Sequence, residues 1–121
     1  MGKPVVHFEI GTRDDAKSAE FYSKLFGWKI VKDEKLNYNV IDTQSGRGIA
    51  GGIFSAPPEM PTFVTFYIAS EDLQADLNKA ESMGATTTMK PMPIPGVGAA
   101  AMFGDVDGNQ IGLFKGNEGA Q

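Results

Sequence analysis

A histidine and a glutamate stand two residues apart in an apolar stretch near the start of the chain, VVHFEI at residues 5–10. His7 is the only histidine in the 121 residues, and Glu9 follows it at strand spacing. Because alternate residues of a strand point to the same face, the two side chains are expected to lie together. An imidazole and a carboxylate can exchange protons with a substrate or bind a metal ion. The sequence leaves the catalytic residues open, with His7 and Glu9 as the best candidates and a hydrogen-bonded filler as the other interpretation of His7.

The rest of the sequence offers few other groups for catalysis. The chain has no cysteine, which excludes disulfides, thiolate nucleophiles and cysteine-based metal centres. No nucleophile elbow, phosphate-binding loop or dinucleotide fingerprint is present. Asp105, Asp107 and Asn109 imitate the start of a calcium loop, but Gln110 and Gly116 stand where such a loop has glycine and glutamate. The segment is therefore predicted to be a tight turn.

The strand that carries His7 is expected to lead into a helix. Either Thr12 or Asp14 can cap this helix, which runs to about residue 26 and stops at Gly27. Its apolar residues form a wide stripe that is expected to be a core face; these are Ala19, Phe21, Tyr22, Leu25 and Phe26.

The same plan returns at residues 64–84, where Ser70 or Asp72 caps a helix and Gly84 ends it. The apolar stripe of this second helix consists of Leu73, Leu77 and Ala80. Further strands are predicted at residues 28–31, 38–42, 48–54, 86–89, 99–103 and 110–115. The chain therefore reads as βαβββ twice.

The proline-rich segments mark the connections. Residues 55–61 are expected to link the two halves, and residues 90–98 to form a loop that either closes over a cavity or simply connects two strands. Residues 116–121 are predicted to be a frayed tail. We expect one domain, 1–121, with repeat halves 4–55 and 62–115.

Two such halves side by side are expected to form a curved mixed sheet around a central cavity, which makes the fold class α+β. Aligning the halves sets His7 against Thr65. If Phe8 packs on its helix, strand alternation turns residues 7 and 9 toward the cavity, and residues 65 and 67 by the same argument. The aromatic residues either line the cavity or belong to the core, and the glycines either leave room or mark a bend. The predicted ligand-binding residues are His7, Glu9, Tyr38, Gly52, Phe54, Thr65, Tyr67 and Gly112.

Two motifs resemble those of a known family. His7, Asp14 and Phe21-Tyr22 match the H-x₆-D-x₆-F-Y opening of the vicinal oxygen chelate superfamily, which includes glyoxalase I, bleomycin-resistance proteins and extradiol dioxygenases. The segment DVDGNQIGLF, at residues 105–114, resembles the family signature D-P-D-G-N-x-I-E-L. The resemblance covers residues 4–115 and implies the glyoxalase/bleomycin-resistance fold of paired βαβββ modules.

The resemblance also allows a prediction about metal binding. Metal-dependent members bind one divalent ion through inward residues on the first and last strand of each half, and these positions here are His7, Gly52, Thr65 and Gly112. Only His7 can act as a ligand, whereas about three protein ligands are needed. Glu9 could join it, but a third partner is missing. We therefore expect no metal site and no cofactor.

The composition of the chain limits the kinds of binding partner that can be expected. A formal net charge of −4 with scattered basic residues argues against nucleic-acid binding. No signal peptide and no apolar run long enough to span a membrane are present, so a bacterial cytoplasmic protein is expected. The resemblance implies a homodimer.

The predicted function is that of a glyoxalase/bleomycin resistance/dioxygenase-like protein that binds a small organic molecule in the sheet cavity without a metal. One alternative is a metal-dependent glyoxalase-like lyase or isomerase, or a ring-cleaving dioxygenase. A second is a structural or regulatory module with a vestigial cavity.

Overall fold

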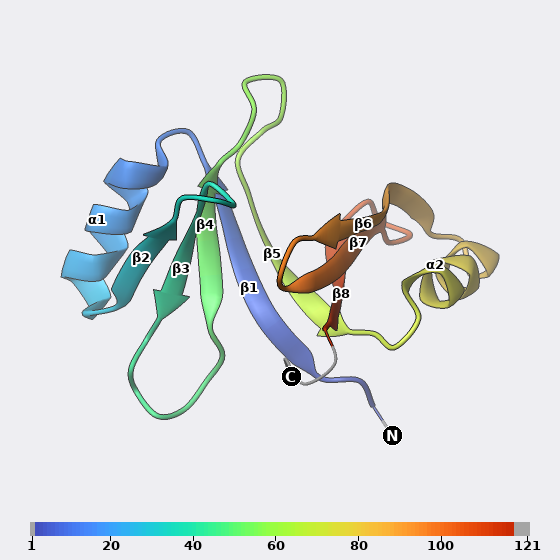
Figure 1. Ribbon diagram of the computed structural model, residues 1–121. Coiled ribbons are helices and arrows are strands. Elements are labelled where there is room, and N and C mark those ends of the chain that lie inside the picture. Colours follow the sequence, from blue (N-terminus) through green and yellow to red (C-terminus); the bar gives the residue numbers. More distant parts are fainter. Residues whose placement is uncertain (1, 118–121) are drawn as a thin grey trace. The chain divides into compact units, whose positions relative to one another are not determined.

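A computed structural model describes residues 2–117, and within them the chain divides into two compact units (Figure 1). The first unit comprises residues 6–65, and the second comprises residues 66–117 together with residues 2–5. Most of the tail predicted at 116–121 lies outside the described residues; Gly116 ends a strand and Asn117 donates its amide to the Val97 carbonyl at 3.0 Å.

The first unit is built from one helix and a mixed sheet. Its elements are β1 (Val5–Thr12), α1 (Asp15–Phe26), β2 (Lys29–Asp33), β3 (Tyr38–Asp42) and β4 (Gly51–Ser55). The strand order is β2-β3-β4-β1, in which β1 and β4 are parallel and the other pairs antiparallel. Helix α1 packs on β2 and β4.

The second unit repeats this plan. Its elements are β5 (Phe63–Ala69), which starts in the first unit, α2 (Leu73–Ser82), β6 (Thr86–Ile94), β7 (Gly98–Gly104) and β8 (Gln110–Gly116). The order β6-β7-β8-β5, again with a parallel pair at β5 and β8, reproduces the order of the first unit. The expected βαβββ repeat is therefore confirmed.

The helix caps show the repeat at the level of single residues. Asp14 accepts a hydrogen bond from the Lys17 amide at 3.1 Å, and Asp72 accepts one from the Ala75 amide at 3.0 Å. Of the alternative caps, the Thr12 hydroxyl bonds Ser18. The Ser70 hydroxyl donates to Asp76, which is six residues further along the chain, as Ser18 is from Thr12. Both bonds are 2.6 Å long. In both repeats, therefore, the aspartate caps the helix, and the hydroxyl residue two positions before it binds a side chain of the helix.

The prediction of a wide core face on α1 is wrong in part. Tyr22 packs on Trp28 with ring centroids 5.8 Å apart, and Phe26 also contacts Trp28 at 5.1 Å but is 56% exposed. Phe21 and Leu25 instead point outward and are 58% and 57% exposed. A 12-residue helix on a single sheet can bury only the narrow stripe that faces the strands. In α2 the stripe is as expected, since Leu73 and Leu77 belong to the buried core.

The prediction of a loop at residues 90–98 is also wrong over most of its length. Strand β6 continues to Ile94 and carries Pro91 and Pro93. It lies at the end of the strand order and pairs with β7 through register shifts between residues 87 and 92. Prolines are tolerated at such an edge because the missing N–H removes no ladder bond there. The β4 strand, conversely, starts at Gly51 rather than residue 48.

No helix in the described part of the chain, residues 2–117, is long and apolar enough to cross a bilayer.

Candidate functional site

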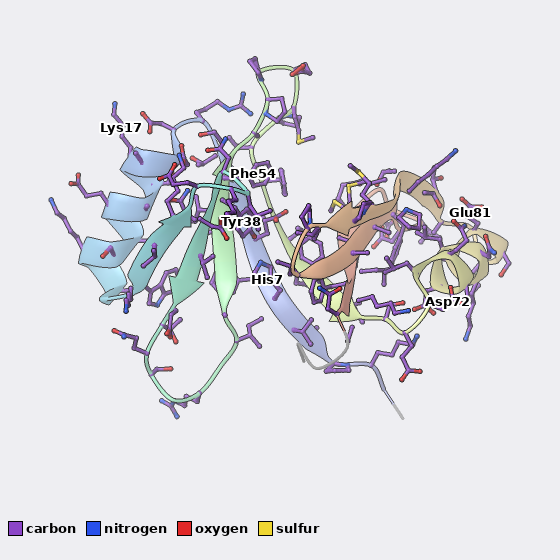
Figure 2. All side chains as sticks on the ribbon, viewed as in Figure 1. His7, Lys17, Tyr38, Phe54, Asp72 and Glu81 are labelled. Carbon is purple, nitrogen blue, oxygen red and sulfur yellow. The ribbon has the colours of Figure 1, made fainter. Side chains whose placement is uncertain are left out.

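His7 and Glu9 lie on the face of β1 that is turned away from α1. The intervening Phe8 packs on Trp28, with ring centroids 5.8 Å apart, and Trp28 in turn contacts the helix. Alternation along the strand then places the two polar residues on the other face. Figure 2 shows His7 beside Tyr38 and Phe54 on this face. The prediction that His7 and Glu9 share the strand face opposite the helix is therefore confirmed.

The Tyr38 hydroxyl joins these two residues. It lies 2.8 Å from His7 Nε2 and donates to Glu9 Oε1 at 3.0 Å. A phenol has one proton, so a hydroxyl that donates to Glu9 Oε1 accepts from the imidazole with its oxygen. His7 is therefore assigned a proton on Nε2. The three side chains form one hydrogen-bonded cluster, which we call the Tyr38 cluster.

The Tyr38 ring covers Gly52. In the sheet, Gly52 pairs with Val40 of β3 and with Glu9 of β1, so it occupies the centre of the site. A Cβ atom added at Gly52 would overlap the hydroxyl oxygen and Cζ of Tyr38. Glycine at this position thus allows Tyr38 to reach across β4 to β1. Of the two interpretations of the glycines, open room in a cavity does not hold at Gly52, because the Tyr38 ring fills that room.

Aromatic rings continue the site along the sheet. The Tyr38 ring stacks on His7 at 6.1 Å and on Phe54 at 6.3 Å, in both cases with an interplanar angle of 26°. Phe54 meets the edge of Phe63 at 5.7 Å, and Phe63 covers Gly11. The row His7, Tyr38, Phe54 and Phe63 gives the site an apolar wall with a polar end.

Burial sets the charge of the polar end. Glu9 is 8% exposed, so its carboxylate needs partners such as the Tyr38 hydroxyl. Burial also lowers the pKa of His7 from its ordinary 6.5, since desolvation disfavours the imidazolium. At neutral pH the site therefore presents a neutral imidazole.

The remaining predicted site residues are Thr65, Tyr67 and Gly112. Tyr67 and Gly112 pair across β5 and β8 in the second unit, and the Tyr67 ring occupies the space of a Cβ at Gly112. Thr65 and Tyr67 are both buried. The structure brings together five of the predicted residues, His7, Glu9, Tyr38, Gly52 and Phe54.

Sequence reasoning missed Phe63 and the bridging role of Tyr38. Phe63 shares strand parity with Thr65 and Tyr67, which is the signal that could have found it. The bridge by Tyr38 depends on a ring crossing a neighbouring strand, for which one-dimensional spacing has no signal.

The family's metal does not fit these residues. Within residues 2–117, no three side chains of histidine, cysteine, aspartate or glutamate come together as a ligand set. The two family positions held by Gly52 and Gly112 are covered by tyrosine rings. The calcium-like segment is a turn, as predicted: Asp105 accepts from the amides of Asp107 and Asn109, both at 2.9 Å.

Paired βαβββ units with a site on the strand face opposite the helix define the class of this protein. A family model described as Glyoxalase/Bleomycin resistance protein/Dioxygenase superfamily matches residues 5–113. The chain belongs to this superfamily.

Individual relatives have low sequence identity to this chain. The chain is 29% identical to the anthracycline biosynthesis protein DnrV of Streptomyces peucetius over 89% of its own length and 45% of the relative. It thus spans less than half the length of the curated relatives it matches. Among solved structures, the hypothetical protein BH1468 from Bacillus halodurans C-125 matches with a TM-score of 0.73 and 12% identity, covering 100% of this chain and 99% of the other.

Methylmalonyl-CoA epimerase from Mycobacterium tuberculosis matches with a TM-score of 0.68 and 13% identity, covering 93% and 87% of the two chains. At these identities the solved structures establish the fold, which is the glyoxalase/bleomycin-resistance fold predicted above.

Proposed function

We propose that this protein binds a small, planar organic molecule without a metal, and that the ligand lies against the aromatic row that starts at the Tyr38 cluster. The observation that carries the proposal is the Tyr38 hydroxyl, held between His7 and Glu9 at 2.8 and 3.0 Å. A hydrogen-bonding end beside stacked rings suits an aromatic ligand with a polar substituent.

The relative DnrV supports this class of ligand, because its name places it in anthracycline biosynthesis and anthracyclines are fused aromatic ring systems. For this chain the ligand class remains part of the proposal.

A binding screen tests the proposal. Purified protein with EDTA present is titrated with an anthracycline, a catechol and an aldehyde–thiol adduct, and binding is followed by calorimetry and thermal shift. We expect the fused-ring compound to bind. Phe54→Leu should weaken binding roughly threefold to tenfold, since a lost aromatic contact is worth about 0.5–1.5 kcal/mol. Phe21→Leu, which removes an exposed ring of α1, is the matched control and should leave affinity unchanged.

The alternative functions have different outcomes. Binding of the aldehyde–thiol adduct only when a divalent metal is added would support a glyoxalase-like enzyme. Binding of none of the three compounds would contradict the proposal and favour a structural or regulatory module.

We extend the proposal to assembly and location: the chain forms a homodimer and works in the bacterial cytoplasm. Superfamily membership supports the homodimer, and the bacterial sources of the relatives support the bacterial part of this proposal. Sedimentation equilibrium of the purified chain and fractionation of the source cells test them.

A further inference from the structure

The Tyr38 hydroxyl lies at a point where three strands of the first unit converge. Its oxygen is within hydrogen-bond distance of His7 Nε2 on one side and Glu9 Oε1 on the other. The same oxygen overlaps the position that a side chain at Gly52 would need. The uncharged hydroxyl oxygen of Tyr38 therefore lies between the His7 imidazole, the Glu9 carboxylate and the space that a side chain at position 52 would fill.

A phenol meets the needs of these neighbours without a charge. It accepts from the imidazole N–H and donates to the carboxylate, so both groups are satisfied. A divalent cation at this point would need an imidazole without a proton on Nε2 and about three protein ligands, whereas within residues 2–117 no three side chains of histidine, cysteine, aspartate or glutamate come together.

The second unit contains a matching replacement. Tyr67 covers Gly112 as Tyr38 covers Gly52, although the tyrosine comes from a different strand of the repeat. Twice, therefore, a glycine at a ligand position of the superfamily is accompanied by a tyrosine ring in the space that the ligand would fill. This recurrence argues that the rings, and not the glycines alone, exclude a ligand side chain at each of the two positions.

The geometry points to Tyr38 as the residue that takes the place of a metal: its hydroxyl links His7 to Glu9, and its ring fills the space that a ligand side chain at position 52 would need. This inference deepens the proposed function, because it names the residue that makes the same site metal-free. Its consequence is that a ligand is held by hydrogen bonding and stacking and needs no pair of adjacent chelating oxygens.

Substitution of Tyr38 by a shorter acid tests the inference. Glutamate is shorter than tyrosine by roughly one metal–oxygen bond, about 2 Å. Tyr38→Glu should therefore point a carboxylate at the former hydroxyl position and complete a set with His7 and Glu9. We expect this variant to bind one zinc or cobalt per chain, measured by calorimetry and cobalt absorption.

Matched variants define the site. Tyr38→Gln has the same shape without the charge and should bind no metal at the same concentration, and Glu9→Gln in the Tyr38→Glu background should abolish the gain. Emission of Trp28, the single tryptophan, verifies folding. A folded Tyr38→Glu variant that binds no metal at millimolar concentration would overturn the inference. So would a wild-type protein that takes up a stoichiometric metal lost in His7→Ala.

If the variants do not fold, a measurement on the wild-type protein tests the inference about Tyr38. The single histidine gives one imidazole signal pair in ¹⁵N NMR, and the inference requires a proton on Nε2. We expect the Nε2–H tautomer in the wild type, a loss of that preference in Tyr38→Phe, and no change on adding zinc. A wild-type Nδ1–H tautomer, or a zinc-induced shift of Nε2, would refute it.

The two proposals fail separately. The ligand screen with EDTA present reports on binding, whereas the zinc and tautomer measurements need no organic ligand. A protein that binds the fused-ring compound and also takes up zinc would refute only the role of Tyr38.

Discussion

Tyr38 acts through two parts of its side chain. The ring fills the space above Gly52 and stacks between His7 and Phe54, and the hydroxyl ties His7 to Glu9. The two contributions can be separated by substitutions, because phenylalanine keeps the ring and loses only the hydroxyl. The polar part concerns a buried carboxylate, where a lost partner is costly.

Tyr38→Phe is expected to lower the free energy of unfolding by about 1–3 kcal/mol, since Glu9 and His7 both lose a buried hydrogen bond. Urea denaturation at neutral pH, followed by Trp28 emission, measures this. Tyr22→Phe is the matched control: within the described residues the Tyr22 hydroxyl makes no hydrogen bond and its ring stacks on Trp28. Equal effects of the two substitutions would show that the Tyr38 hydroxyl adds no stability.

His7 should make stability depend on pH. Burial lowers its pKa in the folded state, whereas the unfolded chain protonates near 6.5. As the pH falls through 6.5 the unfolded state binds more protons, so stability decreases, by at most about 1.4 kcal/mol per pH unit. Unfolding measured at pH 8 and pH 5.5 should show this decrease in the wild type and a smaller one in His7→Gln. An identical decrease in the variant would assign the effect to other groups.

At the scale of elements, the start of α1 is fastened to the sheet by one carboxylate. Asp15 accepts from Asn39 Nδ2 of β3 and from the Ser55 hydroxyl of β4, both at 2.8 Å, and lies 3.4 Å from Lys32 Nζ of β2. Asn39 is itself buried and also donates to the Ile53 carbonyl at 3.0 Å. The hydrogen bonds from Asn39 and Ser55 are the main reason that the pKa of Asp15 falls to about 2. The fastening fixes α1 on the face that leaves His7 and Glu9 on the opposite side.

Asp15→Asn should reduce stability at pH 7 by about 1–3 kcal/mol, because hydrogen bonds to a charged group are lost. The folded-state pKa is depressed, so the contribution is present above the unfolded value of 3.8 and disappears as the pH falls toward 2. Thermal unfolding between pH 7 and 2.5 should therefore show the two proteins converging in acid. Glu20→Gln, which removes an exposed ion pair with Lys24 on the same helix, should change little. A constant difference at all pH values would contradict the assignment.

At the scale of the whole chain, the repeat is as regular in its contacts as in its order of elements. Each copy caps its helix with an aspartate, binds a hydroxyl two residues before that cap to a helix side chain six residues after the hydroxyl, and covers a glycine of its last strand with tyrosine. The tyrosines come from different strands, β3 in one copy and β5 in the other. In both repeats, therefore, a tyrosine ring covers the glycine, although the tyrosine stands at a different position in each repeat.

The two covered glycines should respond alike to an added methyl group. Gly52→Ala and Gly112→Ala should each destabilise the protein by about 1–3 kcal/mol, because the new Cβ displaces a packed tyrosine ring. The penalty at Gly52 should shrink in the Tyr38→Ala background, as a double-mutant cycle would measure. Gly2→Ala, where a Cβ meets no atom within 4 Å, is the control. A neutral Gly52→Ala would mean that the ring moves away freely.

Features that depend on local order along the chain could be predicted from the sequence. The hydrophobic alternation, the aspartate caps and the glycine stops predicted both βαβββ copies, and strand parity placed His7 and Glu9 on one face. It also showed that the metal ligands of the superfamily are missing at Gly52 and Gly112. These inferences hold because caps, turns and parity act within a few residues of the chain.

Which side chains fill the site and which face outward could be seen only in the folded chain. Tyr38 reaches Glu9 by crossing β4, and whether a glycine leaves a hole or receives a ring depends on that neighbouring strand. The exposure of Phe21 and the continuation of β6 through two prolines depend likewise on which element packs or pairs beside them. Side-chain direction and strand partners come from contacts between residues far apart in the chain, and such contacts leave no local pattern in the sequence.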